Sequence, residues 1–386
     1  MGRVRAAKSE TRKAAFSDGQ PGPQRRLINE LPLTNRHIAE LLVLQGEKEE
    51  GYKRKAYFRA AHSAFIWPEE AAFILEQNRS LTELGGIGPS LAKIVARWIE
   101  NPPDPITPPP LRQNFLTLTE ARQVIDSHPG WRTDLKGDLQ MHTTWSDGAG
   151  SVRDMAEAAL GRGYEYIAIT DHTAGLKIAN GIDETELAKQ ASEIDALNAE
   201  FAATKTRFRV LKSVELNLSP TGEGDLDCDF LDRLDIVLGS FHSQLRVKED
   251  QTARYLAALE NPCVQILGHP RGRVYNFRLG LKADWARVFA RAAALDKAVE
   301  IDAYSDRQDL DVELLQIARQ EGVRISFGSD SHHPWQLLFL DLALGAAILA
   351  GIPRERVINF MPADELLAWV KSVRNGSARV RRTART

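Results

Sequence analysis

The segment "GDLQMHTTWSDG", residues 137–148, joins a short apolar strand pattern to a cluster of polar side chains. Asp138, Gln140, His142 and Asp147 all lie within it. Residues two apart in a strand share a face, so Gln140 and His142 point the same way. Imidazole and carboxylate groups at one strand end are ligands of a transition metal, so we expect a metal site here. Gln140 is its weakest member, because an amide is a neutral ligand.

Six further short strands follow this segment, with helical patterns such as 151–163 and 311–322 between most of them. Their sequences are "YEYIAIT", "RVLKSVEL", "DIVLGSF", "VQILGH", "KAVEID" and "RISFGSD". Seven strand–helix units in succession predict an α/β fold, either a parallel barrel or a doubly wound sheet.

Polar side chains recur where these strands end, and the carboxyl ends of parallel barrel strands meet at one rim. They are His142, Asp147, Asp171, His172, Glu215, His242, His269, Asp330 and His332. Taken singly, a strand-end His or Asp is more often a cap or a packed residue. Five of the nine histidines fall at these ends, however, and a buried lone carboxylate such as Glu215 is costly unless it is paired or metal-bound.

This set exceeds one coordination sphere, so we expect two or three divalent ions with Glu215 bridging. Mixed imidazole and carboxylate ligands favour Mn²⁺, Zn²⁺ or Fe²⁺ over Ca²⁺ or Mg²⁺ alone. Clustered divalent ions activate water and clamp an oxyanion, which is the arrangement for phosphoester hydrolysis.

The chain has 386 residues, 43% hydrophobic and 26% charged, with no apolar run long enough for a membrane span. Its first residues do not form a secretory signal. Cys228 and Cys263 lie far apart in sequence, which predicts a reducing, cytoplasmic compartment and excludes a cysteine-based zinc site. Basic residues crowd an arm at 1–26 and a tail at 373–386. We expect both to be disordered, with weak attraction to nucleic acid as the alternative.

Residues 27–100 have helical patterns and form a predicted all-α domain, and 101–133 are a proline-rich linker with a lead-in helix. The stretch "LTELGGIGPSLAKIV" resembles a helix-hairpin-helix motif, in which Gly86 and Gly88 permit the turn. Backbone N–H groups there can hold a DNA phosphate, with Lys93 and Arg97 adding charge. An ordinary helix hairpin used for packing is the alternative.

The motifs "DLQMHTTWSDG", "ITDH", "VELN", "SFHS", "GHPRGR" and "SDSHH" resemble those of the PHP (polymerase and histidinol phosphatase) family, over residues 134–372. The resemblance implies a distorted (β/α)7 TIM-like barrel with a trinuclear metal site. One metal would take Gln140, His142, Glu215 and Asp330. A second would take Glu215, His242 and His269, and a third Asp147, His172 and His332. Many members have His at the position of Gln140, although versions attached to bacterial family X DNA polymerases also carry Gln.

Residues from about 28 to 100 resemble the N-terminal domain of those polymerases, which binds gapped DNA without sequence preference. Ile94 stands where some members have a lyase lysine. The stretch between linker and barrel is too short for a polymerase palm.

Arg271 and Arg273, with Lys177 and Arg246 as further candidates, are positioned to bind phosphate, although a surface salt bridge is an equally plausible role for each arginine. Asp171 is expected to orient a ligand or assist proton transfer.

These features predict a metal-dependent phosphoesterase that acts on DNA 3′ ends in repair, as a 3′–5′ exonuclease or a 3′-phosphatase. It would bind DNA ends or gaps and associate with the nucleoid of a bacterial cytoplasm, without a membrane. One alternative is a small-molecule phosphatase of the histidinol phosphatase type. The other is a non-catalytic repair scaffold with structural metals.

Overall fold

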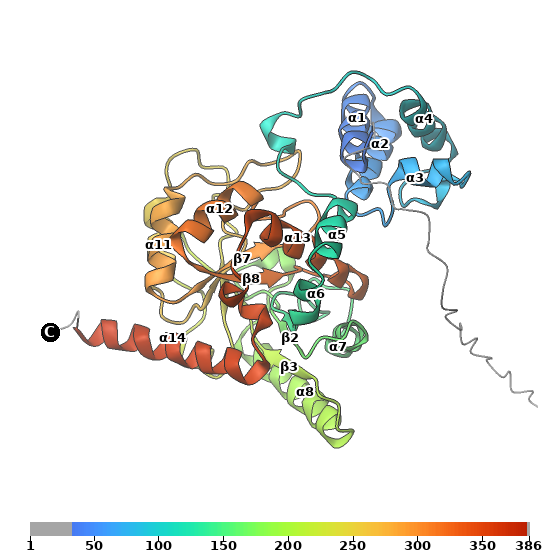
Figure 1. Ribbon diagram of the computed structural model, residues 1–386. Helices are drawn as coiled ribbons and strands as arrows, with labels where there is room; N and C mark the ends of the chain where they lie inside the picture. Colours follow the sequence, from blue (N-terminus) through green and yellow to red (C-terminus); the bar gives the residue numbers. More distant parts are fainter. Residues whose placement is uncertain (1–32, 384–386) are drawn as a thin grey trace, which may run out of the picture.

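The computed structural model describes residues 33–383, with side chains as far as residue 376. The arm predicted at 1–26 lies outside this range. A small helical part and a larger α/β part lie side by side (Figure 1). The small part consists of α1 (Asn35–Glu47), α2 (Gly51–Ala64), α3 (Ala71–Glu76) and α4 (Pro89–Glu100).

The small part has its own hydrophobic core. Helix α1 begins after Thr34, as the sequence predicts, and packs on α2. Ile38, Leu42, Trp67 and Ile74 are each at most 1% exposed. Four helices with a buried apolar centre explain how so short a segment holds its shape.

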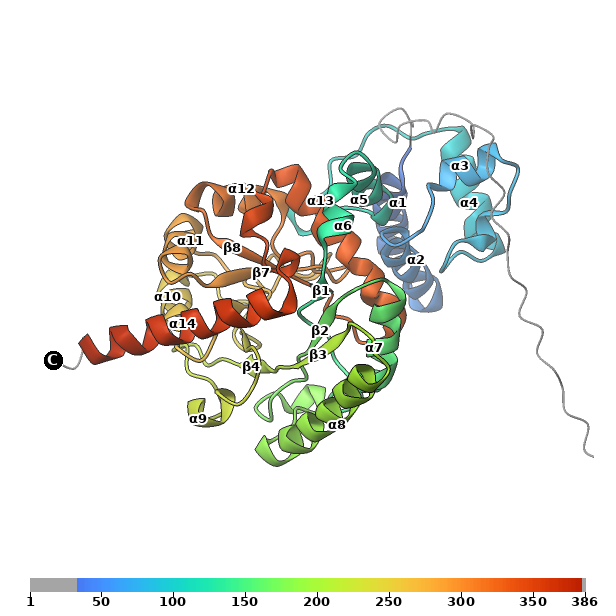
Figure 2. The ribbon, with the colours of Figure 1, turned by 60° about the horizontal axis from the view of Figure 1, so that its bottom comes forward.

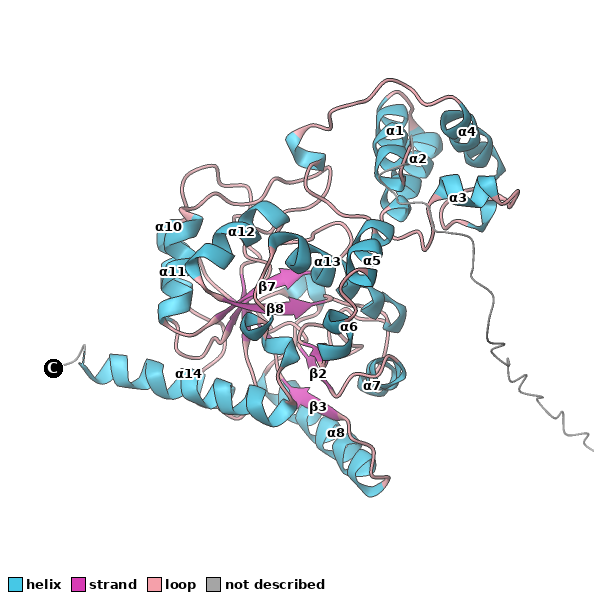
Figure 3. Ribbon diagram, viewed as in Figure 1, coloured by secondary structure: helices cyan, strands magenta, loops and turns pink. Residues whose placement is uncertain are grey.

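Eight parallel strands form the centre of the larger part, with helices around them (Figure 3). The first sheet contains β1 (Gly137–Asp138), β2 (Tyr166–Ile169) and β3 (Arg209–Lys212). The second sheet contains β4 (Glu215–Asn217), β5 (Leu238–Ser240), β6 (Ile266–Leu267), β7 (Ala298–Asp302) and β8 (Arg324–Gly328). The surrounding helices are α7 (Val152–Gly161), α8 (Glu184–Ala203), α10 (Thr252–Glu260), α11 (Trp285–Ala294), α12 (Val312–Glu321) and α13 (Leu340–Ala350). A mixed α/β fold with parallel sheets is therefore confirmed.

The predicted strand "RVLKSVEL" is interrupted, which divides the seven expected strands into eight. Lys212 ends β3, where its N–H donates to the side chain of Asp235, and the strand resumes at Glu215. Backbone hydrogen bonds cross both seams between the sheets. The N–H of Glu215 donates to the carbonyl of Asp171 at 3.2 Å, and that of His142 donates to Ser331 at 2.8 Å. The strands are assigned to two sheets, and the single barrel stays a prediction.

Helix α14 (Ala363–Thr383) closes one end of the strand bundle (Figure 2). Trp369 and Val370 pack against residues near the beginnings of the strands, including Leu238, Ile266 and Ala298. The prediction of a disordered tail from residue 373 is wrong as far as Thr383, because the apolar face of this helix continues through Val373. Most of the predicted polar ligands lie at the opposite end of the strand bundle, where the strands finish.

The loop after β6 joins the two parts of the molecule. Tyr275 is buried in the core of the small part, with its ring 4.7 Å from that of Phe65 and 5.2 Å from that of Phe115. Arg112 and Glu40 form an ion pair at 2.8 Å nearby, with both side chains only 6% exposed. Residues at the end of the predicted linker are therefore packed in place. The helix α5 (Leu118–Asp126) follows them, as predicted.

Cys228 and Cys263 are joined by a disulfide bond, with their Cα atoms 5.7 Å apart. Their separation in sequence therefore does not support the expectation of a reducing compartment, because the fold brings the beginning of the short helix α9 (Cys228–Leu231) next to the segment after α10. None of the helices between residues 33 and 383 is long and apolar enough to cross a membrane.

Candidate metal centre

Loops that follow the strands, together with Glu215 at the beginning of β4, bring the predicted ligands together. Five imidazoles and three carboxylates meet there, although they are spread over nearly two hundred residues of sequence. Three overlapping groups have ligand atoms close enough to share an ion. They are His142, Asp147, His172 and His332; His172, Glu215 and His242; and His142, Glu215 and Asp330.

Glu215 is the hub of the centre and is fully buried. Its Oε1 lies 2.7 Å from Nε2 of His269 and 3.2 Å from Nε2 of His242. Its Oε2 lies 3.1 Å from Nδ1 of His172 and 3.4 Å from Nε2 of His142. Each carboxylate oxygen thus faces two imidazoles, as expected of a bridging ligand.

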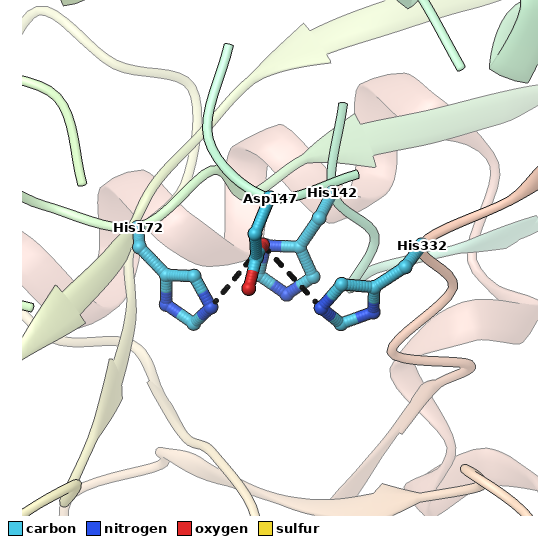
Figure 4. A group of neighbouring side chains, drawn as sticks. All are labelled: His142, Asp147, His172 and His332. Carbon is cyan, nitrogen blue, oxygen red and sulfur yellow. Dashed lines mark ion pairs between the residues drawn. The ribbon is translucent and has the colours of Figure 1, made fainter. Parts of the chain in front are cut away.

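Asp147 is the partner of a second set of imidazoles (Figure 4). Its Oδ1 lies 3.4 Å from Nε2 of His332 and 3.7 Å from Nε2 of His172. The ring of His142 stacks on that of His172 at 4.3 Å. The predicted third ligand set, Asp147, His172 and His332, is therefore assembled.

Several ligand atoms are buried without a hydrogen-bond partner among the described residues: Nδ1 of His142 and of His172, Oε2 of Glu215 and Nε2 of His242. Unsatisfied buried polar atoms are costly, and here they lie next to one another. The donor set mixes imidazole and carboxylate, which suits transition metals. The residues present therefore fit bound divalent ions.

The charges of the cluster reinforce one another. Although burial opposes its charge, nearby imidazoles such as that of His269, whose own pKa is raised, hold the pKa of Glu215 well below its ordinary value. Burial lowers the pKa of His172 to about 3, which leaves a neutral ring ready to bind metal. Burial also acts against a charged His142, but its hydrogen bond to Asp330 and the nearby carboxylates raise the pKa of His142 to about 9. A metal would have to displace that proton.

Gln140 faces a carboxyl group that the sequence analysis did not single out. With its amide nitrogen turned toward Glu300, it donates to Oε1 at 2.7 Å and to Oε2 at 3.0 Å. Burial, then the charge of Asp302, raises the pKa of Glu300 well above its ordinary value, so an uncharged pair results. This contact occupies the amide nitrogen, and the ligand role of Gln140 stays a prediction.

The backbone is constrained at two of the ligands. His269 and Asp330 have φ angles of 21° and 51°, a region that residues other than glycine rarely adopt. Such strain is concentrated at functional sites, where surrounding contacts impose it. Close packing also requires a glycine after Asp147. A Cβ on Gly148 would lie 2.5 Å from the carbonyl carbon of His142.

Asp171 is buried and uses both carboxylate oxygens to hold the loop that carries Asp147. Oδ1 accepts hydrogen bonds from the N–H of Thr143 at 2.8 Å and from the hydroxyl of Ser146 at 2.5 Å. Oδ2 accepts from Oγ1 of Thr143 and from Nε2 of Gln190, each at 2.6 Å. These contacts favour a positioning role over the predicted role in proton transfer.

The two arginines predicted to bind phosphate pair with one carboxylate. Nη1 of Arg271 and Nη1 of Arg273 both lie 2.7 Å from Oδ2 of Asp311. Arg273 is buried and also lies over the ring of Phe115, at the junction with the small part. The predicted role of both in catalysis is thus not favoured by these contacts. The side chains of Lys177 and Arg246 are exposed.

Besides Glu300, three further residues at the centre were missed: Arg307, Asp302 and Asn217. Nη1 of Arg307 lies 2.7 Å from Oδ2 of Asp330, and its side chain is 33% exposed. It also lies 3.6 Å from the buried carboxylate of Asp302. Oδ1 of Asn217 lies 3.1 Å from Nδ1 of His242 and fixes that ring. The signal for Asn217 was its position two residues after Glu215.

The helix-hairpin-helix candidates lie together on the small part. Gly86 has a φ of 79°, and Gly88 is the residue before α4, with Pro89 in the first turn. A Cβ on Gly88 would meet no atom within 4 Å, so its backbone is open to approach. Lys93 and Arg97 are exposed, one turn apart on α4.

Comparison with known proteins places this fold and site. Residues 138–325 match the PHP domain family. The chain is 38% identical over 271 residues to the DNA polymerase/3′-5′ exonuclease PolX of Bacillus subtilis. The aligned residues make up 69% of this chain but only 46% of PolX. A probable phosphatase of Shewanella sediminis is 30% identical over 245 residues, which are 60% of this chain and 92% of the relative.

A solved histidinol phosphate phosphatase of Lactococcus lactis, complexed with zinc, histidinol and phosphate, aligns with a TM-score of 0.39 and 20% identity. It covers 57% of this chain and 95% of that one.

Fold and site together define a metal-dependent hydrolase of phosphoric esters. The chain belongs to the PHP domain family, and its match to PolX spans about half of that protein's length.

Proposed function

We propose that this protein hydrolyses phosphoester bonds at DNA 3′ ends, as a 3′–5′ exonuclease or a 3′-phosphatase in DNA repair. The observation that carries the proposal is the packing of a helix-hairpin-helix-like part against the part of the molecule that holds the metal centre, through the loop that begins at the ligand His269. Tyr275 of that loop is buried in the core of the small part. The similarity to PolX of Bacillus subtilis, whose name includes a 3′-5′ exonuclease, supports the same proposal.

The parallel strands provide the frame, and we propose that the two sheets act as one distorted barrel. Glu215 would bridge two or three divalent ions, with His242 and His269 on one side and His142, with Asp330, on the other. Asp147, His172 and His332 would hold the ion nearest solvent, because Asp147 is the most exposed of the carboxylates, at 30%. Ions bound there would activate a water molecule and neutralise phosphoryl oxygens.

Arg307 is the arginine placed to contact the phosphate. One edge of its guanidinium is anchored by Asp330, while a third of the side chain is open to solvent. A guanidinium presents five donors in a plane and can hold two phosphoryl oxygens at once. We therefore assign to Arg307 the role predicted for Arg271 and Arg273.

The small part would hold the DNA behind the reacting end. The first turn of α4 leaves its backbone N–H groups free to bind a phosphate, and Gly88 leaves room for one to approach. Lys93 and Arg97 would add attraction that weakens as salt rises. Such contacts read no bases, which fits binding to ends or gaps without sequence preference.

One set of assays tests the proposal. Purified protein with Mn²⁺ would be given 3′-recessed DNA, 3′-phosphorylated DNA and histidinol phosphate. Release of nucleotides or phosphate from DNA is expected. Turnover of histidinol phosphate alone would establish a small-molecule phosphatase instead. Bound metal without any turnover would indicate a repair scaffold.

A further inference from the structure

Large hydrophobic side chains are exposed on the loops around the metal centre. Among residues 33–376, eight such side chains are well exposed, and four of them follow β2, β6 or β8 at their carboxyl ends: Ile178 (92%), Phe277 (60%), Leu279 (46%) and Trp335 (47%). Single exposed hydrophobic residues are ordinary. These four, however, lie on loops that leave the same end of the sheets as the metal ligands, because the strands are parallel. We call these four residues the rim.

Trp335 is connected to a metal ligand by a continuous series of aromatic contacts. The ring of His332 lies 6.1 Å from that of Tyr304, and Tyr304 lies 5.3 Å from Phe339. Phe339 in turn lies 5.4 Å from Trp335, and all three contacts are edge-to-face. Trp335 is also only three residues after His332, a span of at most about 11 Å. The indole is therefore within reach of a base next to a phosphate held at the centre.

The segment that presents Trp335 is held in place by hydrogen bonds. Oε1 of Gln336 accepts from the N–H of His332 at 2.7 Å, and its Nε2 donates to the hydroxyl of Tyr304 at 3.2 Å. Pro334 restricts the backbone immediately before the tryptophan. An exposed aromatic ring that is already ordered loses little entropy when a ligand stacks on it.

Phe277 shows the same chemistry on another loop. The guanidinium of Arg246 lies 4.5 Å from the centre of its ring, although that ring is 60% exposed. Lys177, next to Ile178, adds a further exposed cation. Aromatic faces interleaved with cations suit a single strand of nucleic acid, because unpaired bases stack on rings while phosphates pair with the cations. Bases inside a duplex are already stacked and do not present their faces.

We propose that the rim binds the last unpaired nucleotides of a DNA strand, with one base stacked on Trp335 and another on Phe277. The inference rests on the proposed action at DNA 3′ ends and makes it narrower: the strand enters the centre single-stranded. A recessed end in a duplex would have to fray before its phosphate reaches the metal ligands.

The test pairs a protein variant with a modified DNA. Trp335→Ala and the unmodified protein would each be given a single-stranded oligonucleotide, and versions with one abasic nucleotide at each of the last three positions. KM and kcat would be measured with Mn²⁺, and binding by fluorescence anisotropy on the same set. Loss of one stacked base is worth about 1–3 kcal/mol, so Trp335→Ala should raise KM about tenfold. On the oligonucleotide that lacks the stacked base, the variant and the unmodified protein should have the same KM and the same affinity.

Three comparisons separate stacking from a structural effect. Trp335→Phe should recover most of the affinity, since a smaller ring still stacks. Leu349→Ala removes a side chain of similar exposure, 46%, near the C-terminal end of α13 and should change nothing. Hydrolysis of an oligonucleotide whose last three nucleotides are all abasic, a base-free ester with no aromatic ring to stack, should be unaffected by Trp335→Ala.

Two results would overturn the inference. If the loss of affinity caused by an abasic nucleotide and the loss caused by Trp335→Ala were additive at all three positions, no base would stack on the indole. Equal losses on DNA and on the base-free ester would show that Trp335 only supports the fold. Failure to hydrolyse any DNA would count against the proposed function instead, and the anisotropy measurements would still decide whether the bases stack.

Discussion

The amide of Gln140 lies against the buried carboxyl group of Glu300, with 2.7 Å between its nitrogen and Oε1. Gln140 holds the strand position at which many members of the family have a histidine ligand. The same carboxyl group accepts a hydrogen bond from the N–H of His269 at 2.8 Å. Glu300 therefore contacts both Gln140 and the backbone of the ligand His269.

Gln140→His should strengthen metal binding at the site shared by His142, Glu215 and Asp330. An imidazole is a stronger ligand than an amide. Glu300 is placed to accept a hydrogen bond from the other ring nitrogen of the new histidine, an arrangement that raises ligand basicity. We expect about one more tightly bound ion per chain, measured by elemental analysis after dialysis and by calorimetric titration with Mn²⁺.

The double variant Gln140→His with Glu300→Gln is the matched control for this prediction. A Gln at position 300 keeps the size of the side chain but is a poorer partner for the new ring, so part of the gain should disappear. An unchanged metal content in Gln140→His would show that the site already holds its full complement of ions.

His242→Ala should lose metal and abolish hydrolysis while the fold persists, because His242 contacts Glu215 at the edge of the centre. Asn217→Ala should be milder. It removes the 3.1 Å contact that orients the ring of His242, and such supporting partners are worth about 10–100-fold in metal affinity or activity. Elemental analysis, circular dichroism and turnover on one preparation would check both variants. Full activity in His242→Ala would mean that the metal assignment is wrong.

Glu70 should make the stability of the protein fall as pH rises. It is 1% exposed, and its oxygens accept hydrogen bonds from Asn35 at 2.6 Å and from Thr119 at 2.5 Å. Burial raises the pKa of Glu70 from 4.5 to about 7. The folded state therefore binds this proton more tightly than the unfolded chain, and stability is lost between those two values, by about 3 kcal/mol at most.

Glu70→Gln should remove that pH dependence. The amide can accept from Asn35 and donate to Thr119 without carrying a charge at any pH. Near pH 8 the variant should melt at a higher temperature than the unmodified protein, and below about pH 4.5 the difference should vanish. Thermal melts followed by circular dichroism would show this. If the melting temperatures of the variant and the unmodified protein differed by the same amount at every pH, the raised pKa of Glu70 would be contradicted.

The ligand set could be predicted because its residues are unusual where they occur. Histidines and carboxylates at strand ends stand out against an apolar background, and alternation along the strand fixes which of them share a face. Glu300 and Asp302 carry the same signal in "KAVEID", where both are buried, yet only Glu215 was singled out by the cost of a lone buried carboxylate. A consistent use of that criterion would have found them.

Pairing between residues far apart in the sequence was not predictable in the same way. Arg271 and Arg273 follow His269 directly, and their sequence position is compatible with a phosphate contact. Their common partner, Asp311, lies on a different loop, and no periodicity links the two segments. Arg307 was missed for the same reason. The break after Lys212 likewise depends on Asp235, which belongs to the segment before the next strand.

Arg307→Gln should reduce hydrolysis by about two orders of magnitude or more and destabilise the metal-free protein. Its guanidinium is a cation shared by Asp330 and Asp302, and removing one partner of a buried ion pair costs about 3–5 kcal/mol. Added Mn²⁺ should restore much of the melting temperature, because a metal cation compensates the same carboxylates. Activity should stay low, since the phosphate has lost its planar donor.

Arg307→Lys separates the two roles of this side chain. An ammonium keeps the charge but cannot form two parallel hydrogen bonds, so stability should be largely retained while kcat/KM falls. Arg319→Gln, at an exposed position on α12, is the matched control and should leave both quantities unchanged. If Arg307→Lys were as active as the unmodified protein, charge compensation alone would account for Arg307. The phosphate would then have to be held by the metal ions without a bidentate arginine.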